Sequence, residues 1–141
     1  MTKTFDWAKN CAYDEKQKSA FHREARSRLK VLAEVLGLPD GSYDLRSNKG
    51  GIAVSGEVTL HAEHVYIQAS QPVAGSPATG LLIRACEGRR DFTGGRNHFA
   101  SLMALDSPKT LAAYVLRVSP SVRPDLESPD EGPAPLRHQG L

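Results

Sequence analysis

The sequence predicts an α+β fold in which a helix precedes an antiparallel sheet and two shorter helices follow it. Apolar residues repeat with a helical period before residue 37, with a period of two from residue 41 to residue 86, and again with a helical period after residue 97. With 141 residues, 40% of them apolar and 24% charged, the chain has the size of one domain with one core.

The first helix is expected near residues 14–36. Asp14 followed by Gln17 resembles a capping box, and Gly37 with Pro39 supplies a stop. The apolar stripe consists of Phe21, Ala25, Leu29, Leu32 and Leu36. Arg28 is expected to pair with Glu24 one turn earlier.

The segment before this helix contains Phe5, Trp7, Ala8 and Cys11, which indicate either a short helix or an irregular apolar arm over one end of the core. The two cysteines, Cys11 and Cys86, are too few for a disulfide framework, although one bridge is formally possible. Free thiols in a cytoplasmic protein are expected.

The alternating segment predicts four antiparallel strands, at about residues 43–47, 52–62, 65–69 and 81–86, joined in order as a meander. The apolar face of the sheet should rest on helices. Gly56 should mark a bulge, a bend or a close approach of the helix. The opposite face of the second strand is expected to be wet and contains Ala53, Ser55, Glu57, Thr59 and His61.

Two shorter helical patterns follow. Asn97 is a candidate cap for a helix that buries Phe99, Leu102 and Met103. Ser107 and Pro108 then begin the last helix. The apolar stripe of this last helix consists of Leu111, Tyr114, Val115 and Val118. Both helices are expected to pack on one face of the sheet.

The predicted domain covers residues 1–118, and residues 119–141 are expected to form a disordered acidic tail. This tail holds five of the nine prolines and almost no large apolar residues, so it cannot offset the entropy of ordering. A role in solubility is the simpler interpretation, and a partner-docking peptide is the alternative.

The charge of the chain is nearly balanced, with 18 basic and 16 acidic residues, which excludes a protein that merely coats nucleic acid. The distribution is uneven, because residues 1–37, 38–88, 89–118 and 119–141 carry +3, −2, +3 and −2. Without its tail the chain is modestly basic. The chain shows neither a secretory signal nor a membrane-spanning segment, so no membrane partner is expected.

The segment most suited to function is the arginine loop, defined as residues 89–98. Glycines let backbone N–H groups surround an anion, arginines add bidentate donors, and the predicted helix start at Asn97 would add a partial positive charge. The candidate anion-binding residues are Arg89, Arg90, Thr93, Gly94, Gly95, Arg96, Asn97 and His98. Alternatively, the loop is a turn whose arginines pair with Asp91, Glu87 or helix C-terminal carbonyls.

A second basic surface is expected on the first helix. Arg23, Arg26 and Lys30 follow one another at helical spacing on its outward side and form what we call the basic strip. The strip is either a solvated helix face or a surface that follows a phosphate backbone.

Other chemistry is less well supported by the sequence. His61 and His64 flank a turn without further ligands, so no metal or cofactor site is predicted. Cys86, His98 and Asp91 could form a nucleophile, base and orienting group, but no nucleophile motif surrounds them. Most aromatic residues lie at positions of the apolar stripes, with Tyr66 and Phe92 as exceptions, and two rings are too few to predict a stacking surface. The acidic balance of the sheet segment also argues against an RNA-binding sheet face.

The sequence therefore predicts a small non-enzymatic binding protein of the cytoplasm. Its expected partner is anionic and carries phosphate, with nucleic acid as the first candidate, bound through an Arg/Gly-rich loop at a helix N-terminus. The alternative is a protein-interaction module, such as an inhibitor or accessory subunit, that binds an acidic protein surface.

Overall fold

The computed structural model describes residues 5–71, 79–92 and 95–123. Helix α1 (Glu15–Val35) comes first, and helix α2 (Pro108–Val118) lies near the end of the described chain. Between and after them are strands β1 (Tyr43–Asn48), β2 (Glu57–Ala62), β3 (Val65–Ser70), β4 (Leu81–Ala85) and β5 (His98–Ala100), with 3₁₀ helices η2 (Leu102–Asp106) and η3 (Pro120–Val122). The α+β class with an antiparallel sheet is confirmed, with five strands where four were predicted.

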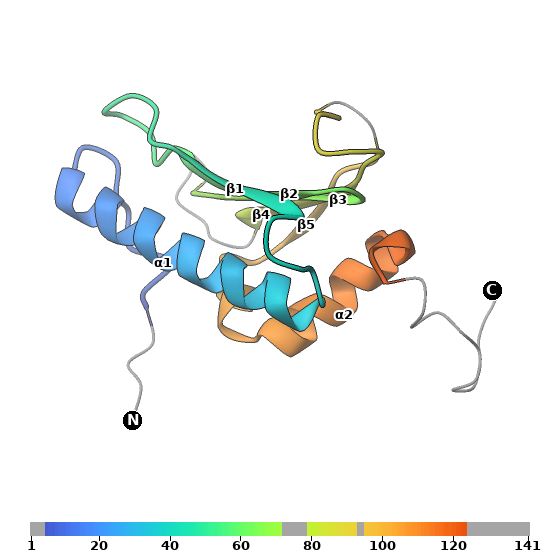
Figure 1. Ribbon diagram of the computed structural model, residues 1–141. Helices are drawn as coiled ribbons and strands as arrows, with labels where there is room; N and C mark the ends of the chain where they lie inside the picture. Colours follow the sequence, from blue (N-terminus) through green and yellow to red (C-terminus); the bar gives the residue numbers. More distant parts are fainter. Residues whose placement is uncertain (1–4, 72–78, 93–94, 124–141) are drawn as a thin grey trace.

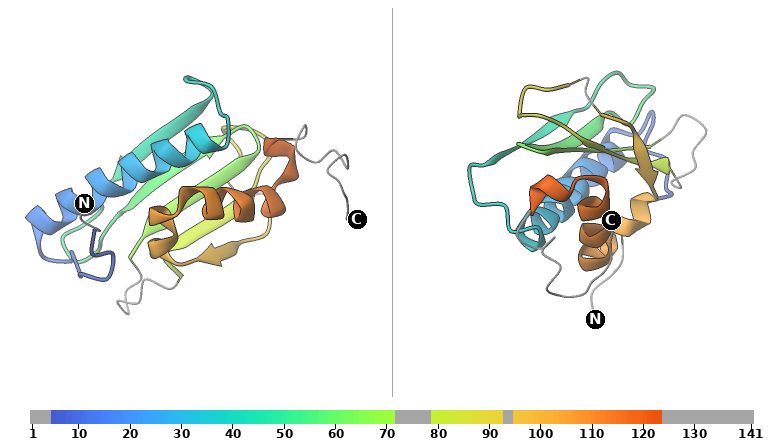
Figure 2. Two further views of the ribbon diagram at one scale, coloured as in Figure 1. Left: turned by 90° about the horizontal axis from the view of Figure 1, so that it is seen from below. Right: turned by 90° about the vertical axis from the view of Figure 1, so that its right-hand side faces the viewer.

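The molecule has two layers, because α1 and α2 lie side by side on one face of the sheet (Figures 1 and 2). The strands run in the order β1-β2-β3-β4-β5, and every neighbouring pair is antiparallel. The core therefore lies between the sheet and the helices. The opposite face, here called the open face, is covered by none of the helices that the structure describes, and the connection between β4 and β5 lies above it (Figure 1).

Strand register decides which side chains reach each face. Leu60 of β2 lies opposite Leu45 and Ile67, and Ile67 lies opposite Ile83, so these residues form one row toward the helices. Leu60, Ile67 and Ile83 are fully buried. Because side chains alternate along a strand, the row beside it faces the open side. That row consists of Arg46, Thr59, Gln68, Leu82 and Phe99.

Helix α1 forms where its stripe and caps predict it. The side chain of Asp14 accepts a hydrogen bond from the backbone N–H of Gln17 at 3.0 Å, which satisfies one of the free donors of the first turn. At the other end Gly37 has φ +78°, the left-handed conformation that commonly ends a helix. The predicted pair of Arg28 and Glu24 is present at 3.7 Å.

The segment before α1 is an irregular arm rather than a short helix. Trp7 and Cys11 are buried in the core. Gln71 fixes the arm, since its side-chain oxygen accepts from the Cys11 N–H and its amide nitrogen donates to the carbonyls of Trp7 and Lys9. Cys11 and Cys86 are free thiols.

The second strand begins at Glu57, later than the predicted residue 52. Ile52 and Val54 are 69% and 43% exposed and belong to the connection between β1 and β2 instead of the core. The physical reason is Gly56, whose φ of +71° bends the chain and whose Cα lies against the backbone of Asn48. The close approach at Gly56 thus involves the backbone of Asn48 and Lys49 and not the helix.

A buried ammonium group holds this connection to α1. Lys18 is 2% exposed, and its Nζ donates to the carbonyls of Lys49 at 3.1 Å and Gly51 at 2.8 Å. One turn later, the ring of His22 hydrogen-bonds through Nε2 to the carbonyl of Ser55 at 2.7 Å. Polar side chains of α1 thus hydrogen-bond to three carbonyls of the connection between β1 and β2.

The prediction of a helix that starts at Asn97 is wrong, because residues 98–100 form the strand β5. Backbone pairing with β4 determines the conformation here and places Phe99 opposite Leu82 on the open face. Phe99 and Met103 are consequently 51% and 61% exposed. Only Leu102 is buried as predicted, in η2, which Ser101 caps through a bond from the Met103 N–H.

The prediction that the open-face side chains of β2 are exposed to solvent is also wrong for the central residues of the strand. Thr59 and His61 project from the open face, yet they are 5% and 0% exposed. A connection 27 residues further along the chain covers His61, as the hydrogen bond to Gly88 shows.

The last helix α2 begins at Pro108 and buries Leu111 and Val115, as predicted. Ser119, the first residue of the expected tail, is 2% exposed, and its hydroxyl donates to the His64 carbonyl at 2.6 Å. Residues 124–141 of the expected tail lie outside the described residues. Within the described part of the chain, no helix is long and apolar enough to cross a membrane.

Candidate functional site

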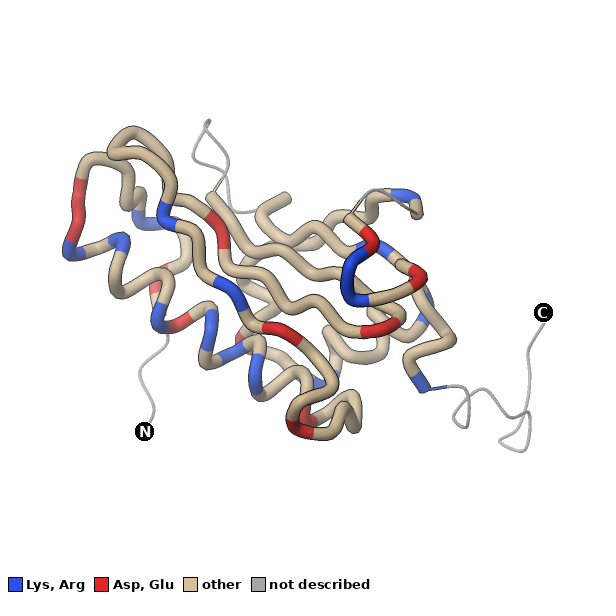
Figure 3. The backbone as a smooth tube through the Cα atoms, turned by 45° about the horizontal axis from the view of Figure 1, so that its top comes forward, with Lys and Arg blue, Asp and Glu red and all other residues tan. Residues whose placement is uncertain are grey.

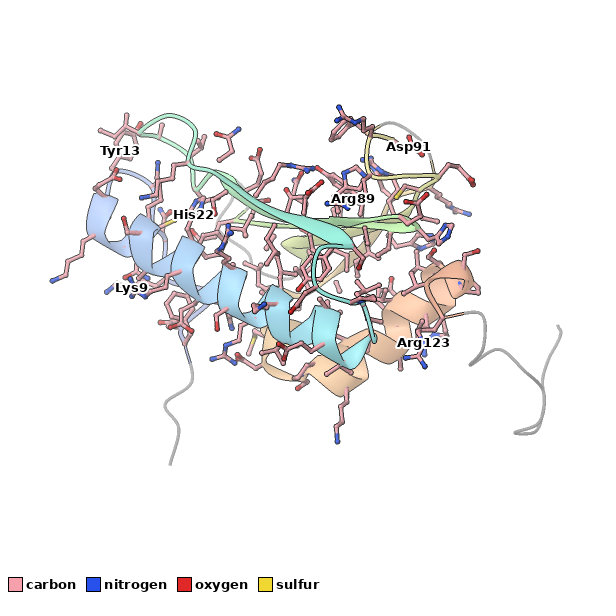
Figure 4. All side chains as sticks on the ribbon, in the orientation of Figure 1. Lys9, Tyr13, His22, Arg89, Asp91 and Arg123 are labelled. Carbon is pink, nitrogen blue, oxygen red and sulfur yellow. The ribbon has the colours of Figure 1, made fainter. Side chains whose placement is uncertain are left out.

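The arginine loop belongs to the connection between β4 and β5, which folds back over the open face of the sheet (Figures 1 and 4). A turn closes its first part, where the Asp91 N–H donates to the Gly88 carbonyl at 3.1 Å. The carboxylate of Asp91 accepts from the Glu87 N–H at 2.9 Å. Asp91 therefore organises the loop backbone.

Arg89 joins the loop to the edge strand β1. Its guanidinium donates to Asp44 Oδ1 at 2.6 Å and to the Gly41 carbonyl at 2.9 Å. The hydrogen bond from Arg89 is the main reason why the pKa of Asp44 lies below its ordinary value. In Figure 4, Arg89 lies between the sheet and the loop. Its role in the structure is to fasten the loop.

His61 forms a second fastening from the centre of the open face. Its Nε2 lies 3.0 Å from the Gly88 carbonyl, and its Nδ1 lies 3.1 Å from Nη2 of Arg46. A carbonyl can only accept and a guanidinium can only donate, so the ring must be neutral with its proton on Nε2. Burial lowers the pKa of His61, in agreement with this neutral form.

Phe92 lies over the sheet beside these groups and is 54% exposed. Its ring is edge-on to His61, with 5.1 Å between the ring centroids, and the guanidinium of Arg46 is 5.5 Å from its centroid. Arg84 fixes the backbone by donating to the Phe92 carbonyl at 2.9 Å while it stacks on Tyr66 at 4.5 Å. Arg84 is therefore a positioning residue for the phenylalanine.

Arg90 and Arg96 are the exposed cations of the loop. Neither guanidinium forms an ion pair or hydrogen bond with any residue that the structure describes. The alternative in which Asp91 or Glu87 neutralises them therefore does not hold for these two side chains. Both are available to an anion.

The remaining predicted loop residues have different positions. Thr93 and Gly94 lie outside the described residues. Gly95 has φ +85°, and a Cβ there would lie 2.2 Å from the Ala85 carbonyl, so the loop returns directly against β4. Asn97 is exposed beside Arg84, whose Nη1 is 3.4 Å from its Oδ1. His98 lies opposite the buried Ile83, which places it on the helix side of the sheet instead of the open face.

One premise of the predicted site is wrong, because the loop leads into β5 and not into a helix. The helix dipole and free N–H groups expected at Asn97 are therefore absent from this end of the loop. The attraction for an anion rests on the arginines themselves. Sequence reasoning missed Arg46 and Arg84, although their alternation with core residues of β1 and β4 would have placed them on the open face.

The basic strip of α1 approaches the same edge strand from the other side. Arg23, Arg26 and Lys30 are exposed, and Nη1 of Arg26 donates to the carbonyl of Leu45 at 3.2 Å. Figure 3 shows basic segments along α1 that continue on the neighbouring strand β1. The strip therefore contacts β1 from the helix side of the sheet, whereas the loop contacts the same strand through Asp44 from the open face.

The catalytic alternative gains no geometric support. The thiol of Cys86 is buried and donates to the Ala62 carbonyl at 3.5 Å, and burial raises its pKa. No hydrogen bond that the structure describes joins this thiol to an imidazole. Within residues 5–71, 79–92 and 95–123, no three side chains of His, Cys, Asp or Glu form a group that could hold a metal ion.

Comparison of the chain with protein-family models, with curated proteins and with solved structures found no match. The functional argument therefore depends on the residues of this surface alone.

Proposed function

We propose that this protein is a non-enzymatic binding protein that recognises a phosphate-bearing partner, with nucleic acid as the first candidate. The observation that carries the proposal is that Arg90 and Arg96 of the loop are exposed and have no partner among the described residues. The exposed basic strip of α1 adds positive charge on the other side of the edge strand β1, which Arg26 contacts through the Leu45 carbonyl.

The arginines of the loop have two different roles, and this difference supports the proposed function. Arg89 is used to fasten the loop, whereas Arg90 and Arg96 remain exposed without partners among the described residues. Two guanidinium groups on a fastened loop suit a polyanion, because phosphate accepts bidentate hydrogen bonds and arginine keeps its charge at any physiological pH. The buried, free thiols Cys11 and Cys86 suit a cytoplasmic location.

Titrations of a labelled DNA at several salt concentrations test the proposal. Affinity should fall as salt rises from about 50 to 200 mM, since binding to a polyphosphate releases counterions. The double variant Arg90→Ala, Arg96→Ala should bind more weakly and should reduce the slope of log affinity against log salt by about two.

The matched control removes two exposed cations from the helix side of the molecule, Lys109→Ala with Arg117→Ala of α2. Both double variants change the net charge equally, so the control should keep most of the affinity. Equal losses in the two variants, or an affinity that salt does not change, would contradict the proposal.

A competition experiment separates the proposal from its alternative, an acidic protein partner. Inorganic polyphosphate should displace the labelled DNA at a lower concentration of charge than polyglutamate does. Displacement by polyglutamate at an equal or lower concentration would favour a protein-interaction module and remove the phosphate-bearing partner.

A further inference from the structure

We propose that the partner is single-stranded nucleic acid, whose unpaired bases stack on Phe92 and Phe99 across the open face of the sheet. This inference rests on the proposed function and names the class of partner. The carrying observation is that two large aromatic rings on this face are about half exposed, Phe92 at 54% and Phe99 at 51%.

Both rings lie on the open face, one over the strands β1 and β2 and the other on the strand β5. Phe92 contacts Arg46 of β1 and His61 of β2, whereas Phe99 belongs to β5. Three to four strand spacings separate these positions, which corresponds to about 14–19 Å. The row between the rings contains only uncharged side chains, those of the buried Thr59 and of the partly buried Gln68 and Leu82. A strand of nucleic acid that crosses this row meets no charged side chain of the row.

Contacts within the protein fix the position of Phe92. Arg84 fixes its backbone carbonyl, and His61 supports one edge of its ring. The guanidinium of Arg46 lies beside the ring, where it can contact a phosphate next to a stacked base. Because the ring is already positioned, little conformational entropy is lost when a base binds to it.

The acidic balance of residues 38–88 does not oppose this partner. Of the five acidic residues in that segment, Asp40, Glu63 and Glu87 lie in connections rather than strands. Asp44 is paired with Arg89 and Arg46. Glu57 lies at the far end of β2, where it accepts from Asn48 at 3.3 Å. Asp44 is therefore neutralised by its ion pairs, and the other four carboxylates lie outside the row between the rings.

A single strand fits this surface better than a duplex does. Bases in a duplex are stacked on one another and cannot lie on two separated side chains, whereas unpaired bases are free to do so. The exposed phenylalanines would add nothing to a complex with a duplex or with polyphosphate. The rings therefore predict a preference that the arginines alone do not.

The experiment compares one labelled DNA as a single strand and as a duplex, with polyphosphate as a competitor that has no bases. The variant Phe92→Leu, Phe99→Leu keeps apolar volume and removes both rings. It should lose at least about fivefold in affinity for the single strand per ring, while the duplex and polyphosphate bind as before. Tyr13→Leu, which changes an aromatic residue that is 72% exposed at the far end of the molecule, is the matched control (Figure 4).

Ultraviolet cross-linking followed by peptide mapping supplies a second readout, with adducts expected at Phe92 or Phe99. Circular dichroism of each variant checks that the sheet remains folded. Equal binding of single strand and duplex, with no effect of the leucine substitutions, would overturn this inference and leave the proposed function standing. Failure to bind any of the three polyanions would remove both.

Discussion

Arg89 and Asp44 are 45 residues apart in sequence, yet their side chains meet at 2.6 Å and fasten the arginine loop to strand β1. The pair distinguishes the structural arginine of the loop from the exposed ones. Arg89→Ala should release the loop, raise the pKa of Asp44 toward its ordinary value and speed amide hydrogen exchange at residues 88–92. Arg90→Ala should leave exchange unchanged. Hydrogen-exchange mass spectrometry checks both variants, and identical exchange in Arg89→Ala and wild type would refute the fastening role.

Stability should fall as the pH is lowered below about 6.5, because His61 is buried and neutral. Its folded-state pKa is lowered, so the unfolded chain binds a proton first and stability decreases until the pH reaches the folded-state pKa. Protonation also puts a donor at Nδ1 opposite the guanidinium of Arg46. Urea unfolding between pH 7.5 and pH 5 measures the slope, and His61→Gln should flatten it. An unchanged slope in His61→Gln would assign the pH dependence to other groups.

Lys18→Met should lower the free energy of unfolding by about 2 kcal/mol, because the carbonyls of Lys49 and Gly51 lose the charged donor that joins them to α1. Methionine fills similar space without donating a hydrogen bond. Lys16→Met, at an exposed position two residues earlier, should change stability by less than about 0.5 kcal/mol. Denaturation followed by the fluorescence of Trp7, the single tryptophan, measures both. Equal effects of the two substitutions would contradict a special role for the buried ammonium.

Three glycine substitutions should separate backbone strain from steric overlap. Gly51→Ala should change stability by less than about 1 kcal/mol, since its surroundings are open and its φ is unstrained. Gly41→Ala, at φ +84° with open surroundings, should cost about 1 kcal/mol. Gly56→Ala adds a clash at 2.2 Å from the Asn48 carbonyl oxygen and should cost about 2–4 kcal/mol. Thermal or urea unfolding ranks them, and a Gly56 variant as stable as the Gly41 variant would exclude the close approach.

The elements that the sequence predicts well are those whose signals are local. Helix α1 has its stripe, its Asp14 cap and its Gly37 stop within one continuous segment, so the expected and observed bounds agree within one residue. The sequence predicts a helix in place of β5 because Phe99 and Leu102 are spaced as on a helix. Only the backbone pairing with β4 decides between helix and strand. Pairing partners far along the chain are not visible in a local pattern.

In the candidate site, too, the features with local sequence signals are predicted and the features that depend on distant contacts are not. The arginines of the loop were found because they are neighbours in sequence and stand beside glycines. Arg46 and Arg84 were missed, since each is a single charged residue in a strand and acquires a role only when the loop lies on it. The burial of His61 depends on Gly88, which a strand pattern cannot foresee.

The path of the β4–β5 connection over the open face also orders events during synthesis on the ribosome. Asp44 and His61 emerge well before Gly88 and Arg89, so the carboxylate and the imidazole wait for their partners while the chain grows. A nascent chain that ends before the loop carries the strip of α1 without the loop arginines. The complete open-face surface therefore forms only after β5 has been made.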